Sequence, residues 1–258
     1  RFYGKKICHE GNTIYGVAER GNTASTSHFV ALMDNILNDR IRSGDNVVFG
    51  ISGSGQTVGT ALYTLDDLPD RLRRAKRRNE RPAKTTSGRR VAPAPPAYAT
   101  RVRIDSIGTI ADGLPVKRDT VALAKVAAED CLRHSSHDPS DLDLIMFAGV
   151  YRNDFLCDPA VAALLAGELG INSDTRSPDD NRTFVFDVFN GALGFLNACH
   201  VAVQMIRVGK HKNVMVVASE IENNAAVQPE RLLGIKEIAS AVILDESTDA
   251  RSGFGNFV

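Results

Sequence analysis

Phe-Asp-Val-Phe-Asn-Gly-Ala-Leu-Gly-Phe, residues 186–195, is the stretch that decides the fold. It joins an apolar run at 183–188 to an alanine-rich helical pattern at 193–208. A buried strand that turns directly into a helix lifts one side chain at the N-terminus of that helix. The turn therefore predicts an α/β arrangement in which Ala192 lies at the tip, with its Cβ near the helix start and facing a pocket.

Strand and helix patterns alternate on both sides of this turn. From residue 101 onwards we expect strands at 102–107, 142–148, 183–188, 214–218 and 241–244, and helices at 120–133, 159–169 and 193–208. Asp119 and Asp158 stand where helix caps belong, and Pro159 suits a first helical turn. Strands that alternate with helices imply a mostly parallel sheet with helices on its faces.

The front of the chain carries a shorter pattern of the same kind. It predicts a helix at 24–38 with Thr23 available to cap it, a strand at 46–49, a glycine turn at 50–55 and a strand at 61–63. The glycine turn lacks the GxGxxG spacing and the later acidic residue of a dinucleotide site, so we expect no cofactor. The four cysteines show no CxxC spacing, so we expect no metal site and no disulfide framework.

Proline, arginine and small residues interrupt the pattern between the two segments. The run Arg71–Arg90 contains Glu80 as its single acidic residue. We interpret it as a solvated linker, with a docking site for a phosphate-rich partner as the alternative. The sequence thus divides into residues 1–68, a basic and proline-rich linker at 69–100, and residues 101–258.

Composition limits the possible partners. The chain has 258 residues, is 43% hydrophobic and has a formal net charge of zero, so no overall field recruits nucleic acid or an acidic membrane. No apolar run approaches the roughly 18 residues of a membrane helix, and no signal peptide opens the chain. We expect a cytoplasmic protein without nucleic-acid or membrane partners. Arg1 and Val258 are expected to be points of truncation.

Residues 186–195, the Gly-Asn-Thr sequence at 21–23 and the glycine turn at 50–55 resemble parts of a β-ketoacyl synthase III, a thiolase-fold condensing enzyme. The parts occur in reversed order. Residues 15–68 resemble the C-terminal end of such an enzyme, and residues 101–258 resemble its N-terminal half. The resemblance implies layered α-β-α-β-α half-domains with mixed, mostly parallel sheets, and a chain that spans the junction of two tandem modules.

The resemblance also suggests catalytic positions. In the family the place of Ala192 holds a nucleophilic cysteine, whose thiolate the helix dipole stabilises. Residues 190–194 most resemble the variant found in members that join two acyl-CoA chains head to head. Asn22 corresponds to the asparagine that hydrogen-bonds the thioester carbonyl or the enolate. A second Gly-Asn-Thr at 11–13 lacks the following helix. The partner histidine is expected before Arg1.

Other residues are given smaller roles. Gly53 and Gly55 lie in a loop that passes close to the active site of relatives, and Leu156 lies where relatives line the acyl channel and dimer interface. These are our expected substrate-binding residues. Cys199 is expected in the core, and His134 and His137 flank a helix end, where we expect structural roles.

Together these features predict a fragment of a tandem acyltransferase that performs decarboxylative or head-to-head Claisen condensation of acyl thioesters, with acyl-CoA or acyl carrier protein thioesters as partners. We expect a homodimer or a pseudo-dimer of modules. The alternative function is a non-catalytic scaffold that binds acyl carrier protein. A third possibility is that alanine at position 192 is a laboratory substitution of cysteine. We further expect that residues 15–68 and 101–258 do not form one complete active site.

Overall fold

The computed structural model describes residues 9–14, 16–21, 23–53, 57–78, 100–110, 119–172, 182–222, 229–232, 234–249 and 251–257. The helices are α1 (Val17–Arg20), α2 (Ser27–Leu37), α3 (Leu68–Arg78), α4 (Thr120–Arg133), α5 (Val161–Glu168) and α6 (Gly194–Arg207). The strands are β1 (Asn46–Gly53), β2 (Thr57–Thr64), β3 (Val102–Thr109), β4 (Leu144–Phe147), β5 (Phe184–Asp187), β6 (Val214–Glu220), β7 (Ile238–Glu246) and β8 (Gly253–Phe257). In the described part of the chain, no helix is long and apolar enough to cross a membrane.

The strands form two sheets. The larger sheet has the order β3-β7-β6-β4-β5, and the smaller has the order β1-β2-β8. β4 runs parallel to β5 and β6, whereas β7 is antiparallel to both β6 and β3, and the smaller sheet is antiparallel throughout. The predicted α/β class with mixed sheets is confirmed. The strands were expected to be mostly parallel, but only β5, β4 and β6 run parallel to one another. The described part of the segment joining β6 to β7 supplies only a short 3₁₀ turn, and antiparallel neighbours need no crossover helix.

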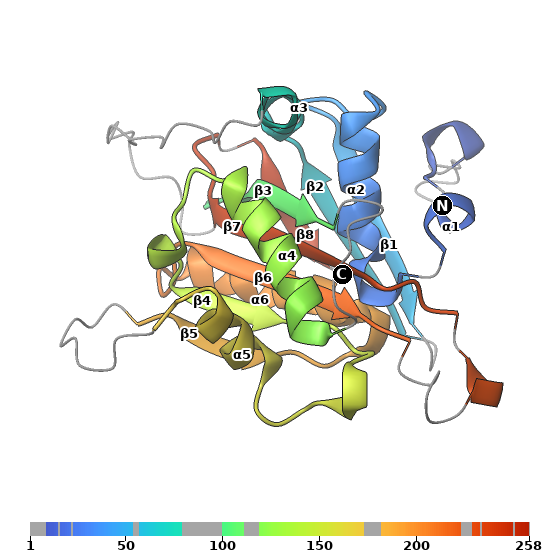
Figure 1. Cartoon of the computed structure of the whole chain (residues 1–258). Coiled ribbons are helices and arrows are strands. Elements are labelled where there is room, and N and C mark those ends of the chain that lie inside the picture. The colour runs from blue at the N-terminus through green and yellow to red at the C-terminus, as the bar shows by residue number, and fades with distance from the viewer. Residues whose placement is uncertain are drawn as a thin grey trace.

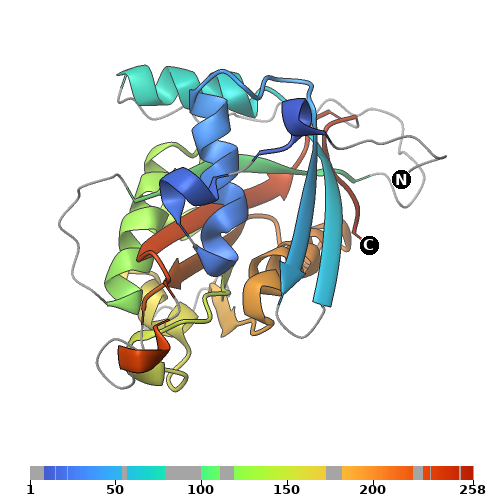
Figure 2. The same cartoon turned by 90° about the vertical axis from the view of Figure 1, so that its right-hand side faces the viewer.

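The elements stack in layers. Val214, Val216 and Ala218 of β6 face one apolar cluster, and the alternate residues Met215 and Val217 face another, because side chains on a strand alternate between its faces. α4 and α5 cover the second face, and α2, α6 and the smaller sheet cover the first (Figures 1 and 2). This gives an α-β-α-β order.

The fifth, helical layer expected outside the smaller sheet does not occur among the described residues. Val48 and Leu62 pair across β1 and β2, and on this outer face they are 56% and 46% exposed.

One hydrophobic core joins the segments on either side of the basic run. Phe29 of α2 packs against Phe49 of β1 and Phe195 of α6, with ring centroids 5.4 and 4.7 Å apart. β8, which the sequence did not predict, pairs with β2 and completes the smaller sheet from the far end of the chain. The domain boundaries stay a prediction, but the described parts of both segments pack as one body.

The basic run begins as a helix rather than as a linker. α3 continues to Arg78, so the prediction of a linker from residue 69 is wrong for its first ten residues. Three apolar side chains spaced four and three residues apart are buried and dock the helix: Leu68, Leu72 and Ala75. The many arginines around them concealed this stripe. Residues 79–99 lie outside the described part.

One helix is capped by the residue just before it in the sequence, and another is capped by a residue from a distant strand. Asp119 caps α4 as predicted, since its carboxylate accepts hydrogen bonds from the N–H groups of Val121 and Ala122 at 3.0 and 2.9 Å. The caps predicted at Asp158 and Thr23 are wrong. α5 begins at Val161, where the carboxylate of Asp187, at the end of β5, accepts the free N–H groups. Thr23 makes no capping bond to the turn that precedes α2.

Gly108 of β3 marks the closest approach between the larger sheet and α4. A Cβ at this position would lie 2.1 Å from the carbonyl oxygen of Ala127 and 2.2 Å from the nitrogen of Cys131. Both are backbone atoms of a helix, so neither can move away cheaply. We expect Gly108→Ala to lower the free energy of unfolding by about 1–3 kcal/mol or more, measured by urea denaturation.

Gly167 of α5 provides the matched control, because a Cβ there meets nothing within 4 Å. Gly167→Ala should raise the free energy of unfolding by about 0.5–1 kcal/mol, since alanine is the better helix former. Equal effects of the two substitutions would contradict this packing of α4 on β3.

Candidate functional site

The turn around Ala192 has the predicted form. β5 ends at Asp187, the 3₁₀ turn Gly191–Leu193 (η5) follows, and α6 begins at Gly194. Ala192 therefore lies between a strand and the N-terminus of a helix, as expected. It is half-buried and packs against the core that contains α2 and α6. That its Cβ faces a pocket stays a prediction.

The Gly-Asn-Thr loop reaches the same place. Asn22 itself lies outside the described residues. The 3₁₀ turn Ala24–Thr26 (η2), two residues further on, contacts η5 and the end of β6, and its Ser25 and Thr26 are buried. The distance from Asn22 to Ala192 is not tested, so the separation of the two segments into different sites stays a prediction. The residues that follow Asn22 nevertheless lie beside the Ala192 turn.

Glu220 connects three elements next to this turn. It ends β6 and is fully buried. The Ser25 hydroxyl of η2 donates to its carboxylate, and the Tyr151 N–H, which follows β4, donates to Oε2 at 2.7 Å. The Val150 N–H lies 3.2 Å from both carboxylate oxygens. Burial raises the pKa of Glu220 to about 7, although the hydrogen bonds from Ser25, Tyr151 and Val150 act to lower it.

A buried ion pair holds the strand that leads into the turn. Nη1 of Arg152 donates to Oδ2 of Asp187 at 2.7 Å, and the arginine is almost fully buried. Its guanidinium lies over the rings of Phe147 and Phe189, 4.8 and 4.0 Å from their centroids. The same Asp187 caps α5. The end of β5, and with it the Ala192 turn, is thereby tied to β4 and α5.

The residues expected to bind substrate lie in different places: β1, which ends at Gly53, contacts the η5 turn that carries Ala192, whereas Leu156 lies elsewhere. Gly53 is the last residue of β1, where it pairs with Thr57, and Gly55 lies outside the described residues. Leu156 is half-buried and packs against the cluster under α4 and α5, on the opposite face of the sheet from Ala192. No contact tests their substrate roles, which stay predictions.

The buried side chains of His28, Cys199 and Cys131 are poorly suited to catalysis. His28 of α2 packs edge-on to Phe49, and burial lowers its pKa to about 4 although a hydrogen bond with the Gly50 backbone raises it. Cys199 of α6 is buried in the core, which confirms its predicted role. Burial raises the pKa of the Cys199 and Cys131 thiols well above their usual range, so neither forms a thiolate readily.

Sequence reasoning missed the residues that hold the site together. Ser25 and Glu220 are 195 positions apart, and only the fold places them in contact. A glutamate that follows the apolar run Val214–Ala218 and Ser219 was the one available signal, because an acidic residue at a buried position requires partners. Arg152 and Asp187 carried no signal of their own.

Comparisons with known proteins point to one group of enzymes. No model of a known protein family matches the chain. The chain is similar in sequence to bacterial β-ketoacyl-[acyl-carrier-protein] synthases III. It is 30% identical over 130 residues to the enzyme of Methylococcus capsulatus, covering 50% of this chain and 37% of that one. It is 33% identical over 94 residues to the enzyme of Aliarcobacter butzleri, covering 36% and 25%. The chain thus spans less than half the length of these relatives.

Solved structures give a weaker likeness of the same kind. The 3-oxoacyl-[acyl-carrier-protein] synthase III of Aquifex aeolicus superposes with a TM-score of 0.45 at 21% identity, covering 57% of this chain and 55% of that one. OleA of Xanthomonas campestris superposes with a TM-score of 0.47 at 18% identity, covering 60% of each chain.

Glu220 predicts a pH-dependent stability. Because the folded protein raises its pKa from 4.5 to about 7, the folded state favours the protonated carboxyl. Its contribution is complete below pH 4.5 and is lost as the pH rises through about 7, with a slope of at most about 1.4 kcal/mol per pH unit. Glu220→Gln, an isostere of the protonated form, should flatten this slope in urea unfolding measured from pH 4.5 to 7.5.

Glu246→Gln at the exposed end of β7 is the control and should retain the wild-type slope. A Glu220→Gln protein whose stability falls with pH as steeply as wild type would show that Glu220 is ionised throughout the range.

Proposed function

We propose that this chain is a fragment of a β-ketoacyl synthase III-like acyltransferase whose parent condenses acyl thioesters, by decarboxylation or by head-to-head Claisen chemistry. The observation that carries the proposal is the position of Ala192 at a strand-to-helix turn. Acyl transfer at such a turn needs a thiolate, which attacks the thioester carbonyl as the carrier thiol leaves, and a helix N-terminus stabilises that thiolate. The sequence similarity to ketoacyl synthases III supports the same chemistry.

In this proposal the half that follows the basic run is degenerate. Alanine supplies no nucleophile at position 192, and the buried thiols of Cys131 and Cys199 do not replace it. The loop after Asn22 lies beside the Ala192 turn, which supports pairing of the two segments as a single unit that resembles a condensing site but lacks its thiol. Acyl-CoA or acyl carrier protein thioesters are the ligands that such a unit would bind.

One observation favours a scaffold role as the second candidate. β5 is an edge strand of the larger sheet, and Phe184 on it and Phe189 just after it are 56% and 55% exposed. A four-residue edge strand with exposed aromatic residues offers free backbone groups and apolar area to another chain. Pairing of a second copy, or of another module, along β5 would make this half a dimerisation partner.

Restoring a thiol tests the proposed chemistry. Wild-type protein incubated with an acyl-CoA should show no stoichiometric acyl adduct by intact-protein mass spectrometry, because position 192 has no sulfur. Ala192→Cys should acquire one adduct, mapped to position 192 by peptide analysis, since the start of α6 lowers the pKa of a thiol placed there. It should release no condensation product with malonyl thioesters, because no base accompanies it.

Cys157, which is exposed, provides the internal control for nonspecific acylation. A stoichiometric adduct on Cys8 or Cys199 of the wild type, or an Ala192→Cys protein that is modified no more than Cys157, would overturn the proposal.

A further inference from the structure

Two arginine side chains converge on β8 from different parts of the chain. Arg101 directly precedes β3, and Arg207 is the last residue of α6. Nη1 of Arg101 and Nη2 of Arg207 both donate to the carbonyl oxygen of Phe254, at 3.2 and 3.1 Å. Because both nitrogen atoms lie within hydrogen-bond distance of one oxygen atom, the two guanidinium groups are close neighbours.

Backbone carbonyl groups hold the Arg207 side chain in place. Its Nε donates to the Thr100 carbonyl oxygen at 3.2 Å, and its Nη2 also donates to the Gly255 carbonyl oxygen at 3.3 Å. These neutral groups orient the guanidinium group without cancelling its charge. An arginine that is already oriented loses less side-chain freedom when a ligand binds to it.

No carboxylate neutralises either arginine within the described part of the chain. Five other described arginines are buried or half-buried, and each forms an ion pair with an aspartate: Arg20, Arg71, Arg73, Arg103 and Arg152. Arg101 and Arg207 are half-buried as well. Burial lowers the pKa of Arg207, and the charge of Arg101 lowers it further. Two like charges therefore lie side by side without an acidic partner.

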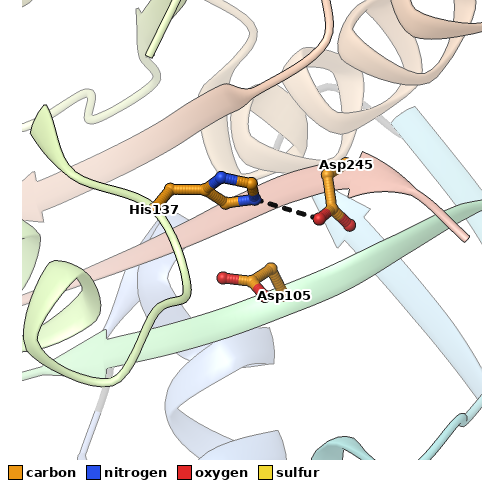
Figure 3. A group of neighbouring side chains, drawn as sticks. All are labelled: Asp105, His137 and Asp245. Carbon is orange, nitrogen blue, oxygen red and sulfur yellow. Dashed lines mark hydrogen bonds and ion pairs between the residues drawn. The ribbon is translucent and has the colours of Figure 1, made fainter. Parts of the chain in front are cut away.

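Arg103 shows how the chain neutralises an arginine elsewhere. It donates to both carboxylate oxygens of Asp245, at 2.7 and 2.9 Å. Figure 3 shows His137 directed at the same carboxylate, with Nε2 3.0 Å from Oδ2, and Asp105 alongside. Ligand atoms of Asp105, His137 and Asp245 lie within 4.8 Å of one another, but a metal ion would have to displace a guanidinium group that already neutralises Asp245. This cluster needs no further ion, unlike the arginine pair at β8.

Both guanidinium groups of the pair keep N–H groups that bind nothing else. An arginine carries five N–H donors. Arg101 donates only through Nη1, and Arg207 donates through Nε and Nη2 but not through Nη1. None of their nitrogen atoms is among the buried, unpartnered atoms of the described residues, so the remaining donors are open to solvent. A ligand can therefore reach them.

We propose that Arg101 and Arg207 form a binding site for a phosphate group where β8, the start of β3 and the end of α6 meet. The fork of N–H donors on an arginine matches the oxygen atoms of a phosphate. Phosphate also matches the charge, because a phosphate monoester carries about −1.5 to −2 at pH 7 and can neutralise both guanidinium groups. A carboxylate would cancel only one of the two positive charges.

The phosphate site is separate from the Ala192 turn. α6 begins next to that turn, at Gly194, and Arg207 is at its other end. With 14 residues and a rise of 1.5 Å per residue, α6 is about 20 Å long. A phosphate group bound at the end of α6 does not occupy position 192, so the proposal is independent of any acyl-transfer function.

Urea unfolding of the full chain in increasing sodium phosphate, with the ionic strength kept constant by sodium chloride, tests the site. In the wild type the ratio of folded to unfolded protein should rise by a factor of one plus the phosphate concentration divided by Kd. Arg101→Gln and Arg207→Gln should each raise this Kd by about tenfold or more, because each removes charge-assisted hydrogen bonds. The variants should keep the nonspecific stabilisation that phosphate gives by exclusion from protein surfaces.

Arg20→Gln is the matched control, because Arg20 is half-buried but paired with Asp34. It should be less stable than the wild type and retain the wild-type response to phosphate. Acetate, a single charge, should give the wild type no rise beyond that of Arg207→Gln. Glycerol phosphate separates two sources of the group: a response at least as large as that to inorganic phosphate indicates a phosphate ester, and a smaller one indicates the free ion.

Isothermal titration calorimetry of the wild type with inorganic phosphate keeps the test decisive if an arginine variant fails to fold. It should show one site with the Kd obtained from unfolding. A wild type that binds no phosphate, equal responses to phosphate in the wild type and both arginine variants, or an equal response of the wild type to acetate would overturn the proposal.

Discussion

Burial of β6 and β7 on both faces is the constraint on which the rest of the structure depends. Nearly every residue of these two strands is removed from solvent. A strand buried on both sides needs a helical or sheet layer against each face. α4 and α5, which lie between strands of the larger sheet in the sequence, form the layer on one face. α6 alone does not complete the layer on the other face. α2 fills the remaining place, and its Phe29 contributes on the order of 1.5–3 kcal/mol by burial, so the front segment is part of the core.

This packing also explains the chemistry of Glu220. When α2 lies over the sheet, the turn before it, η2, covers the end of β6. The carboxyl of Glu220 is then enclosed in an apolar environment, where its charged form is disfavoured and its pKa rises to about 7. The Ser25 hydroxyl and the Tyr151 N–H are the groups that the same enclosure places within reach. The site next to Ala192 is thus a consequence of how the layers close, not of a local motif.

The elements whose signal lies within one turn or one strand could be predicted from the sequence. α4 with its Asp119 cap and the strand-turn-helix around Ala192 belong to this class, because periodicity and capping act over a few residues. α3 was missed because three buried apolar side chains were outnumbered by arginines. The cap of α5 was misassigned to Asp158 because the true cap, Asp187, comes from a strand 26 positions away from Val161. The Ser25 to Glu220 contact and the Arg103 to Asp245 ion pair join partners so distant in the sequence that no local pattern encodes them.

The described parts of the two segments on either side of the basic run pack as one unit. A layered fold requires complementary faces, and α2, β1, β2 and α3 meet the larger sheet through such faces. Apolar surfaces such as those of α2 and α6 attract without fixing a register. The backbone of the edge strand β3 does fix it, because the Ile104 N–H can donate to the Tyr63 hydroxyl and the Asp105 carbonyl oxygen can accept from Nη1 of Arg71 only when β2 and α3 arrive in one position. Backbone polar groups of β3 therefore select how the two segments are placed against each other, and hydrophobic burial then stabilises that arrangement.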